Sequence, residues 1–188
     1  MNVYDFDNTI YDGESLFDFY LFCLKKDFKF IKYFKVILSC LIRYKLCIIS
    51  HEKLTELCGI YCHNFLTDVG DLDKAAKEFW DLHEHKIKPW YFKQKHEDDI
   101  IVSANFDIFL QEILNRLNIK YCISSQVDPK QKIVKVLCFR SKKVSLYKEK
   151  YNNITIENFY TDSKNDVPMM EISKNAYLVK NNKITKIK

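Results

Sequence analysis

The chain has 188 residues, enough for one domain of good size or for a core with an insert. Its hydrophobic content of 47% and aromatic content of 15% exclude a mainly disordered protein. The formal net charge of +5 is too small to indicate nucleic-acid binding by itself, and a phosphorylated substrate or an anionic membrane surface suits it equally well. The 7 cysteines include no CxxC pair, which predicts free thiols in a reducing compartment rather than zinc sites or disulfides.

Two features of the sequence bear on where the protein works. The first predicted strand begins at Asn2, which leaves no room for a signal peptide before it. The longest uncharged apolar run, Val36 to Ile42, is too short to cross a bilayer. We therefore expect a soluble cytoplasmic protein, and we leave open a peripheral contact with the inner face of the membrane.

The first dozen residues bring two acids together. A short β-forming run, Asn2 to Phe6, delivers Asp5 and Asp7, which point to the same face if they lie on a strand. Thr9 follows, and Asp12 with Gly13 then breaks the strand. Two neighbouring carboxylates beside a buried strand are costly unless a cation lies between them. The sequence therefore predicts a metal-assisted site at the carboxyl end of the first strand.

From Ser15 to about Trp90 the apolar residues recur at helical spacing and are rich in aromatics. We expect Pro89 and the aromatic residues after it to end this helical block. A segment at about 28–49 mixes apolar residues with basic ones, which can form either a solvated helix face or a membrane-surface contact. The basic residues of this stripe are Lys25, Lys29, Lys32 and Arg43.

After residue 98 short apolar runs alternate with helical patterns. This alternation predicts an α/β fold, a Rossmann-like core of three α/β/α layers around a parallel, doubly wound sheet. The helices are expected at 106–117 and 142–151, with a further short helix before the last strand. The strands are expected at 99–103, 119–124, 132–139, 154–160 and 176–180.

The helical block falls between the first two strands of this sheet. An insert at that point would lie over the carboxyl ends of the strands, where ligands bind in doubly wound sheets. We therefore expect a core formed by residues 1–14 and 94–188, and a helical cap formed by residues 15–93.

Three polar clusters follow predicted strands and should meet at one rim of the sheet. They are Asp5 with Asp7, then Ser103, then Asp162 with Asp166. Carboxylate oxygens favour Mg²⁺, and a hydroxyl with a lysine from the 142–143 region could bind an anion opposite the metal. This set suits phosphoryl transfer, in which one carboxylate attacks phosphorus and another moves the proton.

In order and spacing, these motifs resemble the four signature motifs of the haloacid dehalogenase superfamily. The matching motifs are Asp5-Phe-Asp-Asn-Thr9, Ser103, a downstream lysine and Asp162-Ser-Lys-Asn-Asp166. The helical insert is similar to the superfamily's subfamily I cap. The resemblance implies that Asp5 is the nucleophile and that Asp7 is the general acid and base.

The same resemblance implies the remaining roles. The phosphate would be bound by Thr9, Ser103 and a lysine, for which we choose Lys143 over Lys142 and Lys132. Mg²⁺ would be held by the Asp5 side chain, the Asp7 backbone carbonyl and Asp162, with Asp166 supporting that shell. An acid at position 7 is typical of the phosphatases rather than of the dehalogenases.

Two positions depart from the family pattern, because Asn8 and Thr161 stand where the family usually has glycine. Asparagine tolerates left-handed backbone angles, so Asn8 should be benign, whereas Thr161 should alter its loop slightly. The phrases that begin at Gly13 and Tyr160 resemble subfamily IB phosphatases, which include phosphoserine phosphatase and a phosphatidylglycerophosphate phosphatase. Glu14 falls where phosphoserine phosphatases read the substrate's amino group, although it also suits a helix N-terminal acid.

The sequence therefore predicts a Mg²⁺-dependent phosphomonoester hydrolase that works through an aspartyl-phosphate. Its substrate would be a small phosphorylated metabolite or a lipid phosphate such as phosphatidylglycerophosphate, and not nucleic acid. A phosphoserine phosphatase, or a phosphotransferase or phosphomutase of the same superfamily, is the alternative. A binding module without catalysis is disfavoured because the acids, the serine and a lysine are all present.

Overall fold

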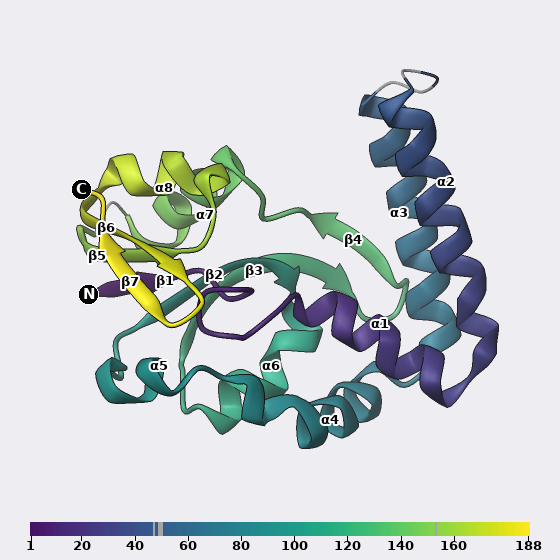
Figure 1. Ribbon diagram of the computed structural model, residues 1–188, viewed down its shortest axis with the longest axis horizontal. Coiled ribbons are helices and arrows are strands. Elements are labelled where there is room, and N and C mark those ends of the chain that lie inside the picture. The colour runs from purple at the N-terminus through teal and green to yellow at the C-terminus, as the bar shows by residue number, and fades with distance from the viewer. Residues whose placement is uncertain (47, 49–50, 153) are drawn as a thin grey trace.

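The computed structural model describes residues 1–188 except 47, 49–50 and 153. Within this described part, one sheet of seven strands has the order β4-β3-β2-β1-β5-β6-β7 (Figure 1). The α/β architecture with helices on both faces agrees with the prediction. The strands are β1 (Asn2–Tyr4), β2 (Ile100–Phe106), β3 (Tyr121–Asp128), β4 (Ile133–Val136), β5 (Ile156–Thr161), β6 (Ser173–Lys180) and β7 (Lys183–Lys186).

The central strands are parallel, as expected. β1 lies between β2 and β5 and runs parallel to both, and the pairs β2–β3 and β5–β6 are also parallel. Val3 and Tyr4 of β1 are fully buried, as the middle strand of a sheet covered on both faces requires. The Tyr4 ring also stacks on that of Tyr160 of β5, with 4.7 Å between the ring centroids.

The two edge strands differ from the predicted parallel sheet, because β4 and β7 are antiparallel to their neighbours. The turn between β3 and β4 spans only residues 129–132, which is too short for a parallel crossover. β7, which the sequence did not predict, follows β6 after two residues, and Asn181 takes the left-handed φ of 54° that such a hairpin turn needs.

The predicted helical block is present, with a correction at its end. Pro89 begins α5 instead of ending a helix, because proline suits the first position of a helix. The predicted limit of the second segment, Ile49, lies outside the described residues. The helices are α1 (Ser15–Lys26), α2 (Ile31–Lys45), α3 (His51–Val69), α4 (Leu72–His83), α5 (Pro89–Gln94), α6 (Asp107–Arg116), α7 (Ser141–Tyr151) and α8 (Val167–Ile172), with 3-10 turns η1 (Phe28–Phe30), η2 (Glu84–Lys86) and η3 (Lys164–Asp166).

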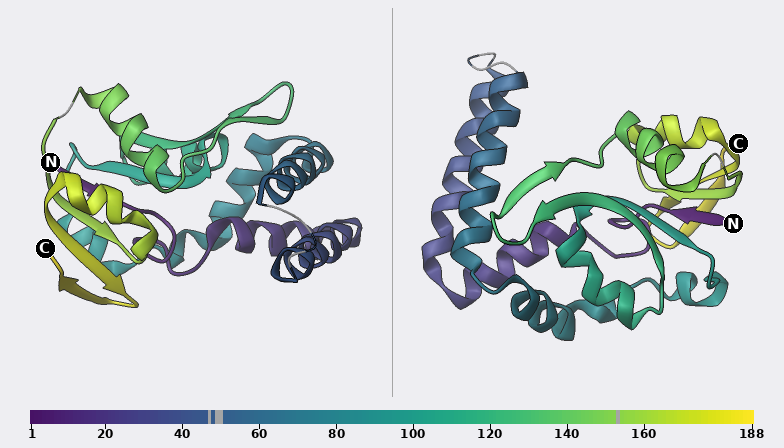
Figure 2. Two further views of the ribbon diagram at one scale, coloured as in Figure 1. Left: turned by 90° about the horizontal axis from the view of Figure 1, so that it is seen from above. Right: turned by 180° about the vertical axis from the view of Figure 1, so that it is seen from behind.

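The helices between β1 and β2 take two different positions. α2 and α3 form an antiparallel hairpin that projects from the body of the molecule (Figures 1 and 2). α4 packs beside α6 instead, where Trp80 Nε1 donates a hydrogen bond of 2.9 Å to the Phe109 backbone oxygen. Phe19 of α1 joins the same cluster, 4.8 Å from the Phe109 ring. Among the described helices, none is both long and apolar enough to cross a membrane.

Candidate active site

The loop after β1 is held in a tight curl over the end of the strand. Asp5 continues the pairing of the sheet, because its backbone N–H donates to Tyr160 O at 2.8 Å. Asn8 then adopts φ of 55°, and its N–H donates to Gly13 O at 2.9 Å. Asparagine thus takes the left-handed angle for which glycine is usual, as expected. The curl keeps the buried Asp5 carboxyl at the carboxyl edge of the sheet.

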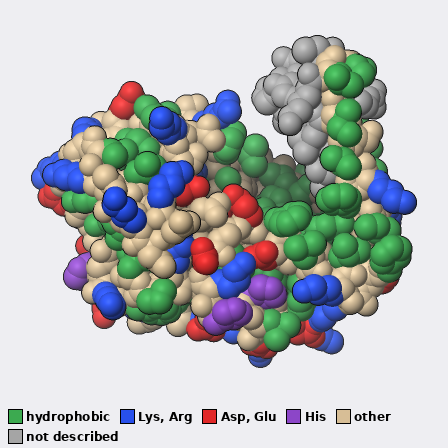
Figure 3. All heavy atoms as spheres, in the orientation of Figure 1, with side chains coloured by type: hydrophobic (Ala, Val, Ile, Leu, Met, Phe, Trp, Pro, Cys, Tyr) green, Lys and Arg blue, Asp and Glu red, His purple; other side chains and the backbone are tan. Residues whose placement is uncertain are grey.

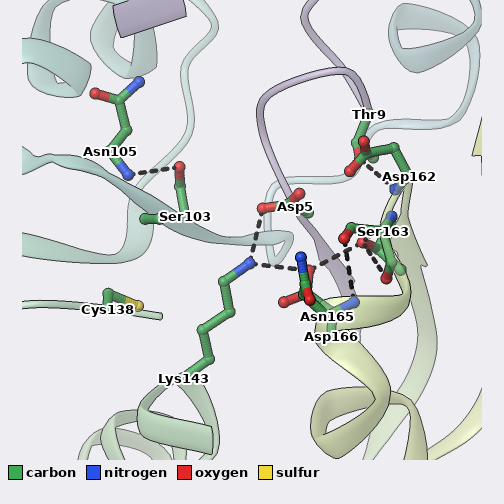
Figure 4. Close-up of polar contacts among 12 residues, drawn as sticks. Asp5, Thr9, Ser103, Asn105, Cys138, Lys143, Asp162, Ser163, Asn165 and Asp166 are labelled. Atoms are coloured by element: carbon green, nitrogen blue, oxygen red, sulfur yellow. Dashed lines mark hydrogen bonds and ion pairs between the residues drawn. The ribbon is translucent and has the colours of Figure 1, made fainter. Parts of the chain in front are cut away.

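A buried lysine joins two acids from opposite ends of the chain. Lys143, in the first turn of α7, donates to Asp5 Oδ1 at 3.0 Å and to Asp166 Oδ2 at 2.9 Å (Figure 4). All three side chains are buried. One ammonium is shared by two carboxylates and balances the charge of only one, so the cluster as a whole stays negatively charged. A buried negative site of this kind attracts a further cation.

The charges in this cluster shift one another's proton affinity. Burial raises the pKa of the Asp5 carboxyl well above its usual range; Lys143 opposes this shift, and Asp166 adds to it. Burial lowers the pKa of the Lys143 ammonium, but the two carboxylates outweigh burial and the net shift is upward. Lys143 is therefore charged at neutral pH.

The loop after β5 brings Asp162 to the same rim. The Asp162 backbone N–H donates to Thr9 Oγ1 at 2.9 Å, which ties this loop to the loop after β1. Thr161 departs from the family's glycine, and its hydroxyl donates to Asp166 Oδ2 at 2.9 Å. Thr161 thus orients Asp166 toward Lys143. Burial raises the pKa of the Asp162 carboxyl, which is only partly exposed.

Asp7 is held by a chain of hydrogen bonds from two buried residues. The Ser15 backbone N–H and hydroxyl both donate to Asp7 Oδ1, at 2.8 and 2.5 Å. Asn105 Nδ2 in turn donates to Ser15 Oγ at 2.6 Å. Burial raises the pKa of the Asp7 carboxyl to about 6, against the hydrogen bonds from Ser15. Both bonds reach Oδ1, which leaves Oδ2 available for a proton.

Ser103 lies inside β2, because this strand continues three residues beyond the predicted end at residue 103. The pairing of β2 with β3 is irregular between Val102 and Phe106, and Ser103 sits in this irregular stretch. Its hydroxyl accepts a hydrogen bond of 3.1 Å from the Asn105 N–H. Since α6 begins only at Asp107, Ser103 is not the N-cap of that helix.

The other candidate residues occupy different places. Glu14 is exposed and accepts a hydrogen bond of 2.6 Å from Asn8 Nδ2. Lys142 is exposed on α7, next to the buried Lys143. Lys132 lies at the turn before β4, where its Nζ donates to Gly70 O at 2.6 Å. The structure therefore brings Lys143 to Asp5 and places Lys142 and Lys132 elsewhere.

The sequence reasoning missed three residues at this rim. Asn105 and Ser15 form the hydrogen-bond chain to Asp7. Lys88, which is buried, donates to the Asn8 backbone oxygen and so secures the curl after β1. Burial lowers the pKa of this ammonium, whereas Asp12 and Asp162 act in the opposite direction. A polar residue two places after Ser103 was a usable signal for Asn105, but no local pattern indicated Lys88.

The donor set at the rim suits a hard cation. Among the described residues, no three His, Cys, Asp or Glu side chains come together as metal ligands. The predicted centre needs only two side-chain carboxylates, from Asp5 and Asp162, together with the Asp7 backbone carbonyl. Oxygen ligands of this kind are those that Mg²⁺ accepts, with water completing its shell. The net negative charge around Asp5 supports the same choice.

We expect Asn105→Ala to lower kcat by up to about tenfold, since the lost hydrogen bond to the neutral Ser15 hydroxyl contributes roughly 0.5–1.5 kcal/mol. The substitution releases the Ser15 hydroxyl that holds Asp7 Oδ1, so the loss should fall on kcat rather than on KM. Ser125→Ala is the matched control. Ser125 is equally buried on the neighbouring strand, but its hydroxyl donates to Ala104 O. Equal kcat losses in both variants, with equal losses of melting temperature, would contradict a role in holding Asp7.

A mostly parallel sheet with acids at the ends of its central strands defines a Rossmann-like α/β protein. A model of the haloacid dehalogenase-like hydrolase family matches residues 3–171, so the chain belongs to this hydrolase family. A search for similar curated proteins found no match.

Solved structures with the same fold include proteins related to phosphoserine phosphatase. A Bordetella pertussis protein of unknown function superposes with a TM-score of 0.69 at 15% identity, over 94% of this chain and 87% of that one. A phosphoserine phosphohydrolase-like protein from Francisella tularensis gives 0.56 at 16% identity, over 94% and 86%. A probable phosphoserine phosphatase from Vibrio cholerae gives 0.52 at 15% identity, over 93% of this chain and 55% of that one. At these identities the likeness establishes the fold.

Proposed function

We propose that the protein is a Mg²⁺-dependent phosphomonoesterase that works through an aspartyl-phosphate on Asp5. The observation that supports this best is the buried cluster in which Lys143 contacts both Asp5 and Asp166. Lys143 holds Asp5 through Oδ1, so Oδ2 is the oxygen that would attack phosphorus. The family model and the fold of the solved structures agree with a hydrolase.

In the proposed first step, Asp5 Oδ2 forms a bond to phosphorus and the ester P–O bond breaks. Asp7 gives its proton to the leaving oxygen, and the proton comes from Oδ2 because Ser15 occupies Oδ1. In the second step Asp7 takes a proton from water, which attacks the phosphoryl group and releases Asp5. Ser103, Thr9 and Lys143 would donate to the phosphoryl oxygens.

A bound Mg²⁺ would neutralise charge on the phosphoryl group and on the acids around it. In this proposal Asp5, Asp162 and the Asp7 carbonyl hold the ion, and Asp166 keeps its place through Lys143 and Thr161. We expect a chelator to stop turnover and added Mg²⁺ to restore it fully. Unchanged phosphate release after exhaustive dialysis against chelator would contradict the metal requirement.

We propose that residues 15–93 act as a cap that selects the substrate. Glu14 lies at the junction with this segment. One oxygen of its carboxylate accepts a hydrogen bond from Asn8 Nδ2, and the side chain is exposed to solvent. A phosphate-release panel should include phosphoserine, sugar phosphates, nucleotides and phosphatidylglycerophosphate in vesicles. The proposal expects Mg²⁺-dependent release from at least one class. Release from none, by folded protein with Mg²⁺ present, would contradict it.

A further inference from the structure

The outer face of α2 carries a stripe of exposed apolar side chains. Phe34 is 44% exposed, Leu38 45% and Ile42 48%, and Leu46 just beyond the helix is 65% exposed. Residues spaced by four lie on one side of a helix, so the three side chains within α2 form a continuous row. Figure 3 shows hydrophobic side chains running along the projecting hairpin.

The opposite face of α2 is already covered by α3. Tyr33 is buried there, and its hydroxyl donates to Asp68 Oδ2 at 2.6 Å. Its ring also packs edge-on against Phe65, with 5.5 Å between the centroids. A helix on the surface of a soluble protein normally has one apolar face, and the outer row of α2 is a second one. Such a row indicates a partner that supplies apolar surface.

The charge around this row identifies the kind of partner. Residues 28–46 contain five basic residues and no acidic one, and the exposed Lys35 lies next to Phe34. Two of the five also pair with acids outside this segment, Lys29 with Asp27 and Lys32 with Asp68. A second copy of the chain would bring the same excess of positive charge against this segment, so the two copies would repel each other there. An anionic lipid surface supplies both negative charge and an apolar interior for the row. The five basic residues are Lys29, Lys32, Lys35, Arg43 and Lys45.

We propose that the outer face of α2 docks the protein on an anionic membrane surface, with Phe34, Leu38 and Ile42 inserted among the lipids. The hairpin projects from the body of the molecule, so this face can reach a flat surface while the sheet and its rim stay in water (Figure 1). The docking involves none of the residues proposed for catalysis. Its test is therefore independent of the proposed phosphatase activity.

Sedimentation with vesicles of phosphatidylcholine, with and without phosphatidylglycerol, tests this docking. Wild-type protein should bind the anionic vesicles. Its binding to the neutral vesicles should be weaker by at least about tenfold. The triple variant Phe34→Ser, Leu38→Ser, Ile42→Ser should lose this binding. Its changes are exposed, so folding should persist, which circular dichroism will check. If the triple variant fails to fold, Leu38→Ser alone replaces it.

The matched control carries the same number of apolar-to-serine changes on other surfaces, at Leu82, Phe92 and Ile133, which are similarly exposed. It should bind vesicles like the wild type. Two results with the wild type would overturn the docking proposal: equal binding to both vesicle types, or no binding to either. Full binding by the folded triple variant, which is called the stripe variant, would overturn it as well. A wild-type dimer that the stripe variant turns into a monomer, without vesicle binding, would instead make this face a contact between copies.

Discussion

Asp5→Asn should reduce phosphate release to less than about one thousandth of the wild-type rate, because Asp5 is the proposed nucleophile and its removal eliminates the covalent route. The fold should survive the change. Asp5 and Asp166 share the single ammonium of Lys143, so a neutral amide at position 5 leaves one balanced ion pair in the buried cluster. We therefore expect an unchanged or higher melting temperature, with steady-state release of phosphate as the activity measurement.

Asp98→Asn serves as the control for this substitution. Asp98 is exposed just before β2, and the same chemical change there should alter neither activity nor stability. Asp5→Asn protein that remains folded and releases phosphate at the wild-type rate would contradict the role of Asp5.

Lys143→Met should destabilise the protein by about 3–5 kcal/mol, since it leaves two buried carboxylates without their cation. Activity should fall as well, because the proposed donor to the phosphoryl group is lost. The measurements are the free energy of unfolding in urea and the rate of phosphate release. A loss of less than about 1 kcal/mol would show that the cluster is not buried as an ion pair.

Two further variants test whether the loss of stability in Lys143→Met comes from unbalanced charge or from altered packing. Lys142→Met changes the exposed neighbour on the same helix turn and should leave stability and activity within error. Combining Lys143→Met with Asp166→Asn removes one of the two stranded carboxylates. Stability should then recover in part while activity stays low. No recovery would mean that the loss in Lys143→Met comes from packing.

The rim of the site was predictable because parallel strands present their carboxyl ends together. Asp5, Ser103 and Asp162 follow or lie within strands whose apolar runs are plain in the sequence, and these strands are neighbours in the sheet through β1. The left-handed backbone at Asn8 could be expected from the residue type alone. The order of the residues and the apolar runs of the strands therefore suffice to predict which side chains meet at the carboxyl edge of the sheet.

Contacts between distant residues were not predictable in this way. The bond from Asn105 to Ser15 joins residues 90 positions apart, and the bond from Lys88 to the Asn8 carbonyl joins residues 80 positions apart. The family resemblance favoured Lys143 over Lys142, but spacing alone could not separate them, because the outcome depends on which side of α7 faces the sheet. Only the fold shows that Lys143 is the buried one.

The antiparallel edges were missed for a related reason. An apolar run indicates a strand but not its direction, which follows from the length of the connection before it. β4 comes after a turn of four residues and β7 after a turn of two, whereas the pattern of strand and helix elsewhere favoured parallel pairing throughout. Short polar turns at positions 129–132 and 181–182 were the available signal.

The central claim, that Asp5 carries the phosphoryl group, is tested most directly by mapping the trapped intermediate. Asp7→Asn removes the proposed base for the second step, and an aryl phosphate needs no proton on its leaving group, so the covalent intermediate should accumulate. Acid quenching followed by peptide mass mapping should place one phosphoryl group on Asp5. Phosphoryl transfer to another residue, or turnover with no phosphorylated peptide at any time, would contradict the account.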